Sequence, residues 1–459
     1  TARIAPGRRA RGLRERGIAL ILAMTTVAIL AVVLADMHES TSTSYALAST
    51  ERDQLRAEYL ARSGINLTRF LIAQEQPIRQ AVTPLLQPLM GRPPGQIPVW
   101  RYASAILRPF CDYDGAQGMS AETGIDFSQA EGLGDTGGTC EVVGFSENSR
   151  INVNDPLNFD GDRARLNVTM QVYAMIGGYQ SPSPFDPLFE RRDADNQITT
   201  RLDIVSALVD WWDPDTQRTN FDPGAAAVTS SGAEDDLYGR LRDPYQVKNA
   251  AFDSIEELRL IRGVGDDFWA TFLEPDPEDP ESRLITIYGS GAVNPNEAAP
   301  EVLIARTCSV LVDQPLCTDV TEAAKFIQIM HTVRSLAPIP WFGRVEQYFQ
   351  FLQGQGGPND LYPMLQMMLG ADNPLLFRPV TISPTAGQQL GAAFVTEARI
   401  VSLHSTGRVG NCRDDGEGVG RCTRVSIRSV LNFHEVWVPP PPNAGMMPRM
   451  GIFHHWRID

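Results

Sequence analysis

The chain is organised around Ile18-Ala-Leu-Ile-Leu-Ala-Met-Thr-Thr-Val-Ala-Ile-Leu-Ala-Val-Val-Leu-Ala35, an uncharged run of 18 residues. As a helix that rises 1.5 Å per residue, this run reaches roughly 27 Å, which is enough to cross the hydrocarbon of a bilayer. Six arginines precede it: Arg3, Arg8, Arg9, Arg11, Arg14 and Arg16. Because basic residues remain on the cytoplasmic side, the run predicts a single-pass anchor over residues 18–36 with the C-terminal body outside.

Charge is distributed unevenly along the 459 residues. Acidic residues outnumber basic ones by 55 to 40, which gives a formal charge of -15. Residues 1–17 carry +5, so the rest of the chain carries -20. An acidic body of this kind argues against a nucleic-acid or anionic-membrane surface as its main function. The length predicts two or three domains, and a hydrophobic content of 43% is enough to form packed cores.

A second helical pattern follows the apolar run. Residues 45–74 contain no proline, and six apolar side chains recur on one face at 100° per residue. These are Leu55, Tyr59, Leu60, Leu67, Phe70 and Leu71. We expect this face to pack on a domain. Joined to the membrane span, residues 18–74 would form one helix of about 85 Å.

The junction before the apolar run carries a short motif. Arg16-Gly17-Ile18, with a basic leader before the glycine and an apolar helix after it, resembles the prepilin-peptidase site of type IV pilins and type II secretion pseudopilins. The resemblance implies that residues 1–17 are a leader, that cleavage follows Gly17, and that Ile18 begins the mature chain. A plain signal anchor is the alternative that this motif leaves open.

Leu22 departs from the usual pattern of these proteins. Most of them carry glutamate at the fifth mature position, where it is thought to meet the N-terminal amine of the neighbouring subunit ahead of it. A carboxylate in hydrocarbon costs a few kcal/mol unless it is paired. A subunit with leucine at this position of the filament register cannot make the contact, which is what a filament tip requires. The large pseudopilin of the K type shares this lack.

A longer resemblance lies in the middle of the chain. The segments Asp203-Ile-Val-Ser-Ala-Leu-Val-Asp-Trp-Trp-Asp-Pro-Asp215, Ser231-Gly-Ala-Glu-Asp-Asp-Leu-Tyr238 and Asp243-Pro-Tyr-Gln-Val-Lys-Asn249 are similar to the hallmark block of the K-type minor pseudopilin of type II secretion, general secretion pathway protein K. Ser149–Asn154 and Val293–Leu303 also match that family in type and order.

The resemblance implies an α+β fold, in which a pilin-like long N-terminal helix packs on an antiparallel sheet and a large, mainly helical domain is inserted. Two segments near the C-terminus, 394–403 and 422–438, largely alternate polar and apolar residues as half-buried strands do. A glycine-rich loop from Gly407 to Gly420 would join them, and 449–459 would add an edge strand. The expected parts are the head's first part (37–160), the inserted helical domain (161–375) and the C-terminal β-sheet (376–459).

Carboxylates gather in two places in the hallmark block. They are Asp210, Asp213 and Asp215, then Glu234, Asp235 and Asp236. Six such groups repel one another unless they are spread in water or gathered on a cation. Calcium takes hard oxygen ligands in flexible loops, but the spacing lacks the full EF-hand pattern, so a solvated acidic loop is the alternative. The resemblance implies a structural Ca²⁺ held by these residues.

Residues 249–265 require a separate interpretation. A helix closed by Gly-Val-Gly at 263–265 resembles half of a helix-hairpin-helix, which in DNA-repair proteins offers backbone amides to a phosphate. Asp266 and Asp267 follow directly, and an acidic flank repels phosphate. We therefore expect a packing motif and no nucleic-acid partner.

The six cysteines allow fifteen pairings. Neighbours in the sequence favour Cys111–Cys140, Cys308–Cys317 and Cys412–Cys422, and a body outside the membrane makes disulfides the expected state. No nucleophile elbow, Walker loop or zincin motif occurs, so no residue is proposed as catalytic and the chain is not expected to be an enzyme.

Together these features predict a minor pseudopilin in the bacterial inner membrane, with its large domain in the periplasm. By resemblance it would initiate and cap the pseudopilus of a type II secretion system. Its partners would be the I-, J- and H-type minor pseudopilins, with the secretin or the exported substrate as further contacts. A minor pilin that primes a type IV pilus, and a membrane-anchored DNA-binding protein that uses residues 249–265, are the alternatives.

Overall fold

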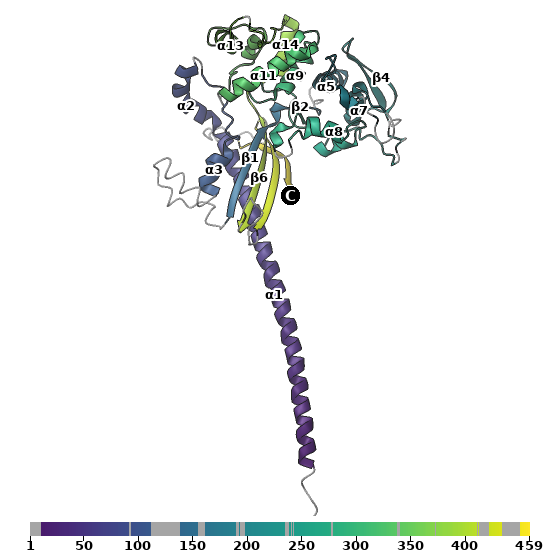
Figure 1. Cartoon of the computed structure of the whole chain (residues 1–459), viewed down its shortest axis with the longest axis vertical. Coiled ribbons are helices and arrows are strands. Elements are labelled where there is room, and N and C mark those ends of the chain that lie inside the picture. The colour runs from purple at the N-terminus through teal and green to yellow at the C-terminus, as the bar shows by residue number, and fades with distance from the viewer. Residues whose placement is uncertain are drawn as a thin grey trace, which may run out of the picture. The chain divides into compact units, whose positions relative to one another are not determined.

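The computed structural model describes residues 11–90, 93–111, 138–154, 161–189, 192, 198–234, 238–239, 241, 243–276, 279–336, 340–371, 373–410, 412, 422–433 and 450–459. Its first element is α1 (Arg11–Ala73), a helix of 63 residues that is prominent in Figure 1. Within the described chain, one helical stretch, Gly17–Ala73, is long and apolar enough to cross a membrane by length and composition, and none of its most apolar window is buried.

The remaining elements alternate between helices and short strands. The helices are α2 (Glu75–Met90), α3 (Ala103–Cys111), α5 (Gly161–Met175), α6 (Asp186–Phe189), α7 (Arg201–Trp212), α8 (Asp266–Phe268), α9 (Pro300–Cys308), α10 (Pro315–Thr318), α11 (Val320–Leu336), α12 (Val345–Leu352), α13 (Leu361–Leu369) and α14 (Pro384–Ala393). The strands are β1 (Gly138–Ser146), β2 (Ile151–Asn152), β3 (Gln217–Asp222), β4 (Ala227–Ala233), β5 (Ile285–Thr286), β6 (Ile400–Gly410), β7 (Cys422–Asn432) and β8 (Ile452–Ile458).

The strands form one larger sheet and two small ones. The larger sheet has four strands in the order β1-β6-β7-β8, of which β1 and β6 are labelled in Figure 1. Strand β8 pairs antiparallel to β7, with Ile427 opposite Ile458. β2 and β5 pair in parallel, and β3 and β4 form an antiparallel hairpin. The predicted α+β fold, with a long N-terminal helix, an antiparallel sheet and many helices between its strands, is confirmed. The domain boundaries remain predictions.

The chain divides into two compact units. The first contains Thr1–Gly64, Arg108–Glu141 and Thr406–Ser426. Here α1 contacts β6 closely, because a Cβ on Gly407 would lie 1.9 Å from the carbonyl oxygen of Ala57. A side chain at position 407 is therefore excluded by the helix backbone.

The buried face of α1 differs from the predicted one. Ala57, Leu60, Ala61 and Ile65 are buried, whereas Tyr59 is 63% exposed. Four more of the predicted side chains are not buried: Leu55 and Phe70 are exposed, and Leu67 and Leu71 are half-buried. The prediction was wrong because small side chains let the helix backbone come close to β6, and a periodicity of large apolar residues does not detect that kind of contact.

The second unit contains Ile65–Leu107, Val142–Ser405 and Ile427–Asp459, and it holds the main hydrophobic core. Figure 1 labels α5, α7, α9 and α11 among its helices. At the end of α1, Arg69 lies over the ring of Phe453 and donates a hydrogen bond to the carbonyl oxygen of Met450 (3.0 Å). The last turns of the helix are thereby tied to the segment that carries β8.

The predicted strand 394–403 and the predicted loop that follows it both need correction at their bounds. The segment 394–403 was predicted as a strand throughout, but β6 begins only at Ile400, and Phe394 makes an isolated parallel bridge to Val293. β6 then continues to Gly410, so its end occupies the start of the predicted glycine-rich loop. The glycine that begins the predicted loop lies within β6 because the backbone of α1 approaches the strand closely there. A glycine in a strand can indicate such an approach of a neighbouring backbone as well as a turn.

Candidate metal centre

Helix α7 carries two of the predicted carboxylates at its C-terminal end. Thr200 caps the start of the helix, and its side chain and that of Asp203 form a reciprocal capping box. The residues from Ile204 to Trp212 are all buried, so the helix is fixed in the core. Pro214 lacks an N–H group, and the helix ends with Asp213 in an extended conformation. Asp210 and Asp213 are thereby held in the protein interior.

The hairpin of β3 and β4 brings the third carboxylate to the same place. The register pairs Gln217 with Ala233, so Glu234, the next residue, lies beside the turn that leads out of α7. The backbone N–H of Thr219 on β3 donates a hydrogen bond to Asp210 Oδ1 (2.7 Å), which ties the hairpin to the helix. A short connection thus joins acidic residues that lie more than twenty positions apart.

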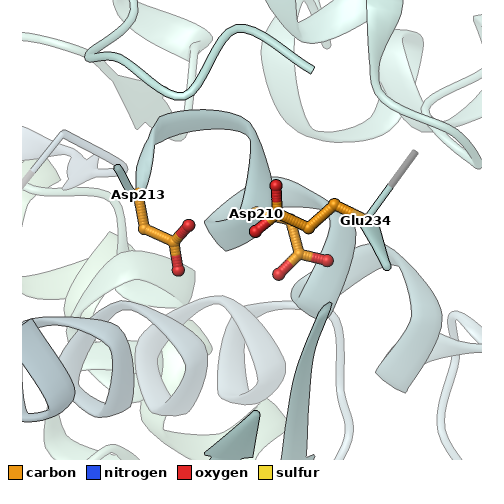
Figure 2. A group of neighbouring side chains, drawn as sticks. All are labelled: Asp210, Asp213 and Glu234. Carbon is orange, nitrogen blue, oxygen red and sulfur yellow. The ribbon is translucent and has the colours of Figure 1, made fainter. Parts of the chain in front are cut away.

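The three side chains form an acidic cluster, defined as Asp210, Asp213 and Glu234 (Figure 2). One carboxylate oxygen of each lies within 4.8 Å of the others. All three residues are at most 2% exposed. Buried negative charges this close repel one another strongly, so the cluster requires compensation by protons or cations.

The pKa values of the three carboxyl groups reflect this repulsion. Burial raises the pKa of Asp210 to about 7. Burial, followed by the charges of Asp213 and Asp210, raises the pKa of Glu234 to about 8. Burial and the charge of Asp215 also raise the pKa of Asp213, while Arg165 opposes that rise. Without a cation, the cluster therefore favours proton uptake.

The available oxygens fit a hard cation. Among the described residues, Asp210 Oδ2, Asp213 Oδ1 and both carboxylate oxygens of Glu234 are buried and have no hydrogen-bond partner. The side-chain oxygen of Asn249 is also buried without a partner, and its amide donates to the carbonyl oxygen of Asp215 (2.8 Å). Unpaired buried oxygens are costly, and carboxylate and amide oxygens are the ligands that calcium prefers.

The other predicted ligands are placed differently. Asp215 lies at the rim, where its side chain is 42% exposed and its Oδ2 accepts a hydrogen bond from Arg165 (3.0 Å). Asp235 and Asp236 lie outside the described residues. Of the six predicted ligands, the structure thus brings Asp210, Asp213 and Glu234 together.

The glycine hairpin packs against the helix that carries this cluster. A Cβ on Gly263 would lie 2.5 Å from Cγ1 of Ile204, and Gly263 has a φ of +91°. The preceding helix is only a 3₁₀ segment, Ile255–Leu260, in place of the predicted longer helix. Asp266 is 96% exposed and pairs with Arg259 (2.9 Å). These contacts agree with a packing motif, and the absence of a nucleic-acid partner remains a prediction.

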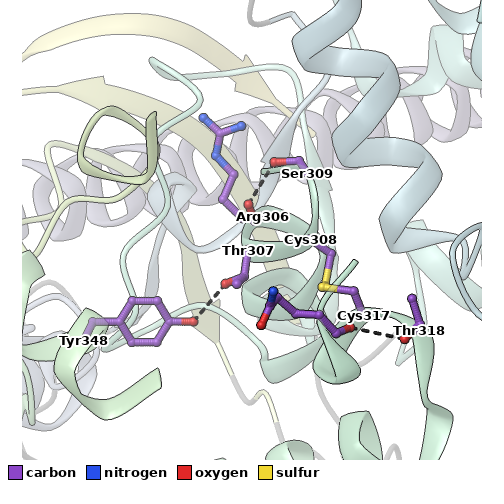
Figure 3. Close-up of a disulfide and its surroundings, with 8 residues drawn as sticks. Arg306, Thr307, Cys308, Ser309, Cys317, Thr318 and Tyr348 are labelled. Atoms are coloured by element: carbon purple, nitrogen blue, oxygen red, sulfur yellow. Dashed lines mark hydrogen bonds between the residues drawn. A yellow bond between two sulfur atoms is a disulfide. The ribbon is translucent and has the colours of Figure 1, made fainter. Parts of the chain in front are cut away.

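All three expected disulfides are present. Cys111 bonds to Cys140, Cys308 to Cys317 and Cys412 to Cys422. The bridge between α9 and α10 is shown in Figure 3 beside a hydrogen bond of 3.3 Å between the hydroxyl groups of Thr307 and Tyr348. Both ends of the Cys308–Cys317 bridge are buried, so it fixes two short helices inside the second unit.

The residues of the predicted processing site lie on α1. Gly17 has no atom within 4 Å of the position that its Cβ would take, and Ile18 and Leu22 are each 60% exposed. Residues 1–10 of the predicted leader lie outside the described residues. The prediction of peptidase processing is not tested by these positions.

Two residues of the site escaped sequence analysis. Arg165 lies on α5, about fifty residues before Asp213 and Asp215, and no local pattern distinguishes it from other helix-surface arginines. Asn249 lies in the last segment of the hallmark block and has a φ of +50°, a conformation that asparagine tolerates better than most residues. The family resemblance included Asn249 in the hallmark block but assigned no role to its side chain.

Residues 149–274 match the family model described as Type II secretion system (T2SS), protein K. This range contains the whole acidic cluster, together with Arg165 and Asn249. The resemblance to the K-type minor pseudopilins is therefore confirmed for this part of the chain.

No curated protein matches the chain. Among solved structures, the chain is similar to one in the crystal structure of the GspK-GspI-GspJ complex from the enterotoxigenic Escherichia coli Type 2 Secretion System. The identity is 14%, the match covers 70% of this chain and 80% of that chain, and the TM-score is 0.37.

Proposed function

We propose that this chain is a minor pseudopilin of the K type, which starts and caps the periplasmic pseudopilus of a type II secretion system. The observation that carries this proposal is the match of residues 149–274 to protein K of that system. The apolar stretch of α1 supports a single-pass anchor in the inner membrane, with the disulfide-bonded body in the periplasm.

The position at the filament tip rests on Leu22. An apolar side chain there matches the hydrocarbon around it and offers no carboxylate to the amine of a subunit ahead. The chain would therefore accept subunits on one side only, which is the property of a cap. Exposed apolar side chains farther along the same helix, among them Tyr45, Leu47 and Tyr59, support helix packing with the I-, J- and H-type subunits.

The proposal includes a structural calcium ion at the acidic cluster. Asp210, Asp213 and Glu234 would hold it, and the side-chain oxygen of Asn249 could add a neutral ligand. The ion would supply positive charge to carboxylates that otherwise remain buried and unpaired. By resemblance, Asp235 and Asp236 would also contribute.

A processing assay tests the pseudopilin assignment. The full chain is co-expressed with a prepilin peptidase, and its N-terminus is determined by mass spectrometry. We expect cleavage after Gly17, loss of cleavage in Gly17→Val, and normal cleavage in Leu22→Val, which changes the span but leaves the cleavage site intact. Unaltered maturation of Gly17→Val would contradict the assignment and favour a plain signal anchor.

A further inference from the structure

Arg165 makes the principal ionic contact at the rim of the acidic cluster. Its Nη1 donates hydrogen bonds to Asp213 Oδ2 (3.2 Å), Asp215 Oδ2 (3.0 Å) and Ser230 Oγ (3.2 Å). Its Nη2 donates to Asp162, three residues earlier on α5. The arginine side chain is only 13% exposed, so one guanidinium group closes the rim of the cluster.

We propose that Arg165 is a built-in counter-cation of the acidic cluster, which holds Asp213 and Asp215 in the calcium-free protein and competes with calcium for them. The inference rests on the calcium site proposed above and describes how that site is regulated. Arg165 would thus set the calcium affinity of the second unit.

The pairing by Arg165 leaves the cluster incompletely neutralised. Its single positive charge faces Asp213 and Asp215 from the rim, while Asp210 Oδ2, Asp213 Oδ1 and both oxygens of Glu234 lack a hydrogen-bond partner. A group that satisfied the whole site would pair these oxygens too, since buried polar atoms normally find partners. The arginine therefore fills one side of a site that is built for a more central cation.

The neighbouring arginine does not perform this role. Arg218 helps to lower the pKa of Asp210, but burial outweighs it, and Arg218 Nη2 donates its hydrogen bond to Asp203 (2.8 Å) at the other end of α7. Arg165 is the arginine that bonds directly to a member of the cluster in the described part of the chain.

The surroundings of Arg165 allow it to leave. Asp162 is 78% exposed and lies on the same helix face, so it can keep the guanidinium paired after the side chain turns toward solvent. Arg165 Nε is buried without a hydrogen-bond partner, so no bond at that atom opposes the movement. The arginine would exchange its contacts with Asp213 and Asp215 for the surface ion pair with Asp162.

Departure of Arg165 would complete the metal ligands. It frees Asp213 Oδ2 and Asp215 Oδ2, which join the unpaired oxygens of Asp210 and Glu234. Calcium requires six to eight oxygens, and it repels a guanidinium at the same carboxylate. Both effects make occupation by Arg165 and by calcium mutually exclusive.

The test compares Arg165→Gln with the wild type, both as full chains in detergent micelles. Calcium affinity is measured by isothermal titration calorimetry with CaCl₂, and the melting temperature is measured in EDTA. We expect Arg165→Gln to bind calcium at least tenfold more tightly and to melt at a lower temperature in EDTA. Arg378→Gln serves as the control, because it removes an arginine that is 68% exposed and bonds to Glu322.

The possible outcomes distinguish failure of the inference about Arg165 from failure of the proposed calcium site. Calcium binding by the wild type with equal or weaker binding by Arg165→Gln would overturn the inference and leave the site intact. No calcium binding by the folded wild type would overturn both. If Arg165→Gln does not fold, Arg165→Lys keeps the charge but loses the fork that bridges two carboxylates, and we expect tighter calcium binding than in the wild type; unchanged binding would overturn the inference.

Discussion

The free-energy cost of burying the unpaired carboxylate of Glu234 indicates that a proton or a cation compensates its charge. The residue is 1% exposed, and neither of its carboxylate oxygens has a hydrogen-bond partner. Its charge is also opposed by Asp210 and Asp213, which lie within reach of the same ion. A natural protein keeps such a group only if a proton or a cation compensates it, and three converging carboxylates favour a divalent cation.

Replacement of one ligand tests this account at the residue scale. We expect Asp213→Asn to weaken calcium binding at least tenfold, which corresponds to about 1.4 kcal/mol. In the wild type, free calcium at about 100 times Kd should add about 2.7 kcal/mol to the free energy of unfolding. Titration calorimetry and thermal melts with calcium or EDTA measure both effects. Asp253→Asn is the control, since Asp253 is 87% exposed and pairs with Lys248, and equal behaviour of the two variants would contradict the site.

His404 on β6 provides a pH prediction that is independent of the metal. Burial, followed by the charge of Arg428, lowers the pKa of His404 to about 4, and its ring packs edge-on against Phe145 at 5.0 Å. The unfolded chain protonates this residue near pH 6.5. The stability that comes from the neutral histidine is therefore fully present above about pH 6.5 and is lost as the pH falls toward 4.

We expect His404→Phe, which keeps an aromatic ring against Phe145, to lose less stability than the wild type between pH 7 and pH 4. The difference grows by at most about 1.4 kcal/mol per pH unit. Urea denaturation at several pH values measures it. Parallel stability curves for the two proteins would show that His404 does not titrate in this range.

Sequence reasoning reached some residues of the site and missed others for a physical reason. Asp210 and Asp213 end a buried helix, and their proximity follows from local spacing. Glu234 required the family resemblance, because only the β3–β4 register returns it to that helix. Neither local spacing nor the family resemblance identified Arg165. Its role depends on how α5 packs beside α7, and no sequence motif predicts that packing.

At the scale of elements, the contact between α1 and β6 depends on small residues. Ala57 and Ala61 are completely buried on the helix, and Gly407 faces them from the strand. The alternation of polar and apolar residues predicted that strands exist near the C-terminus but placed their ends incorrectly. Periodicity reports which side chains are apolar, whereas the observed register depends on where two backbones can approach.

Substitution of this glycine tests the contact. We expect Gly407→Ala to lower the free energy of unfolding by about 3 kcal/mol, because its Cβ would lie 1.9 Å from the carbonyl oxygen of Ala57. Gly391→Ala on α14 is the matched control, since no atom lies within 4 Å of its added Cβ and alanine favours a helix. Chemical denaturation followed by circular dichroism measures both, and a neutral Gly407→Ala would show that α1 does not approach β6 so closely.

At the scale of the whole molecule, the described elements are those expected of a subunit that assembles into the proposed filament. An apolar N-terminal helix, an antiparallel sheet and a large helical region with a buried acidic cluster are compatible with a subunit that is anchored at one end and packed against neighbours. In the proposed filament, Leu22 limits addition at one end and the bulk of the body obstructs it. The opposite face of α1, which retains exposed apolar side chains, is available to partner helices.

Complex formation with the proposed partners is the most direct test of this account. The full chain is co-expressed with I- and J-type minor pseudopilins of a type II secretion system and purified in detergent, and the mass of the product is measured by size-exclusion chromatography with light scattering. We predict a stable complex that contains one copy of each subunit. Elution of this chain alone, while the I- and J-type subunits associate without it, would contradict its assignment as the K-type pseudopilin.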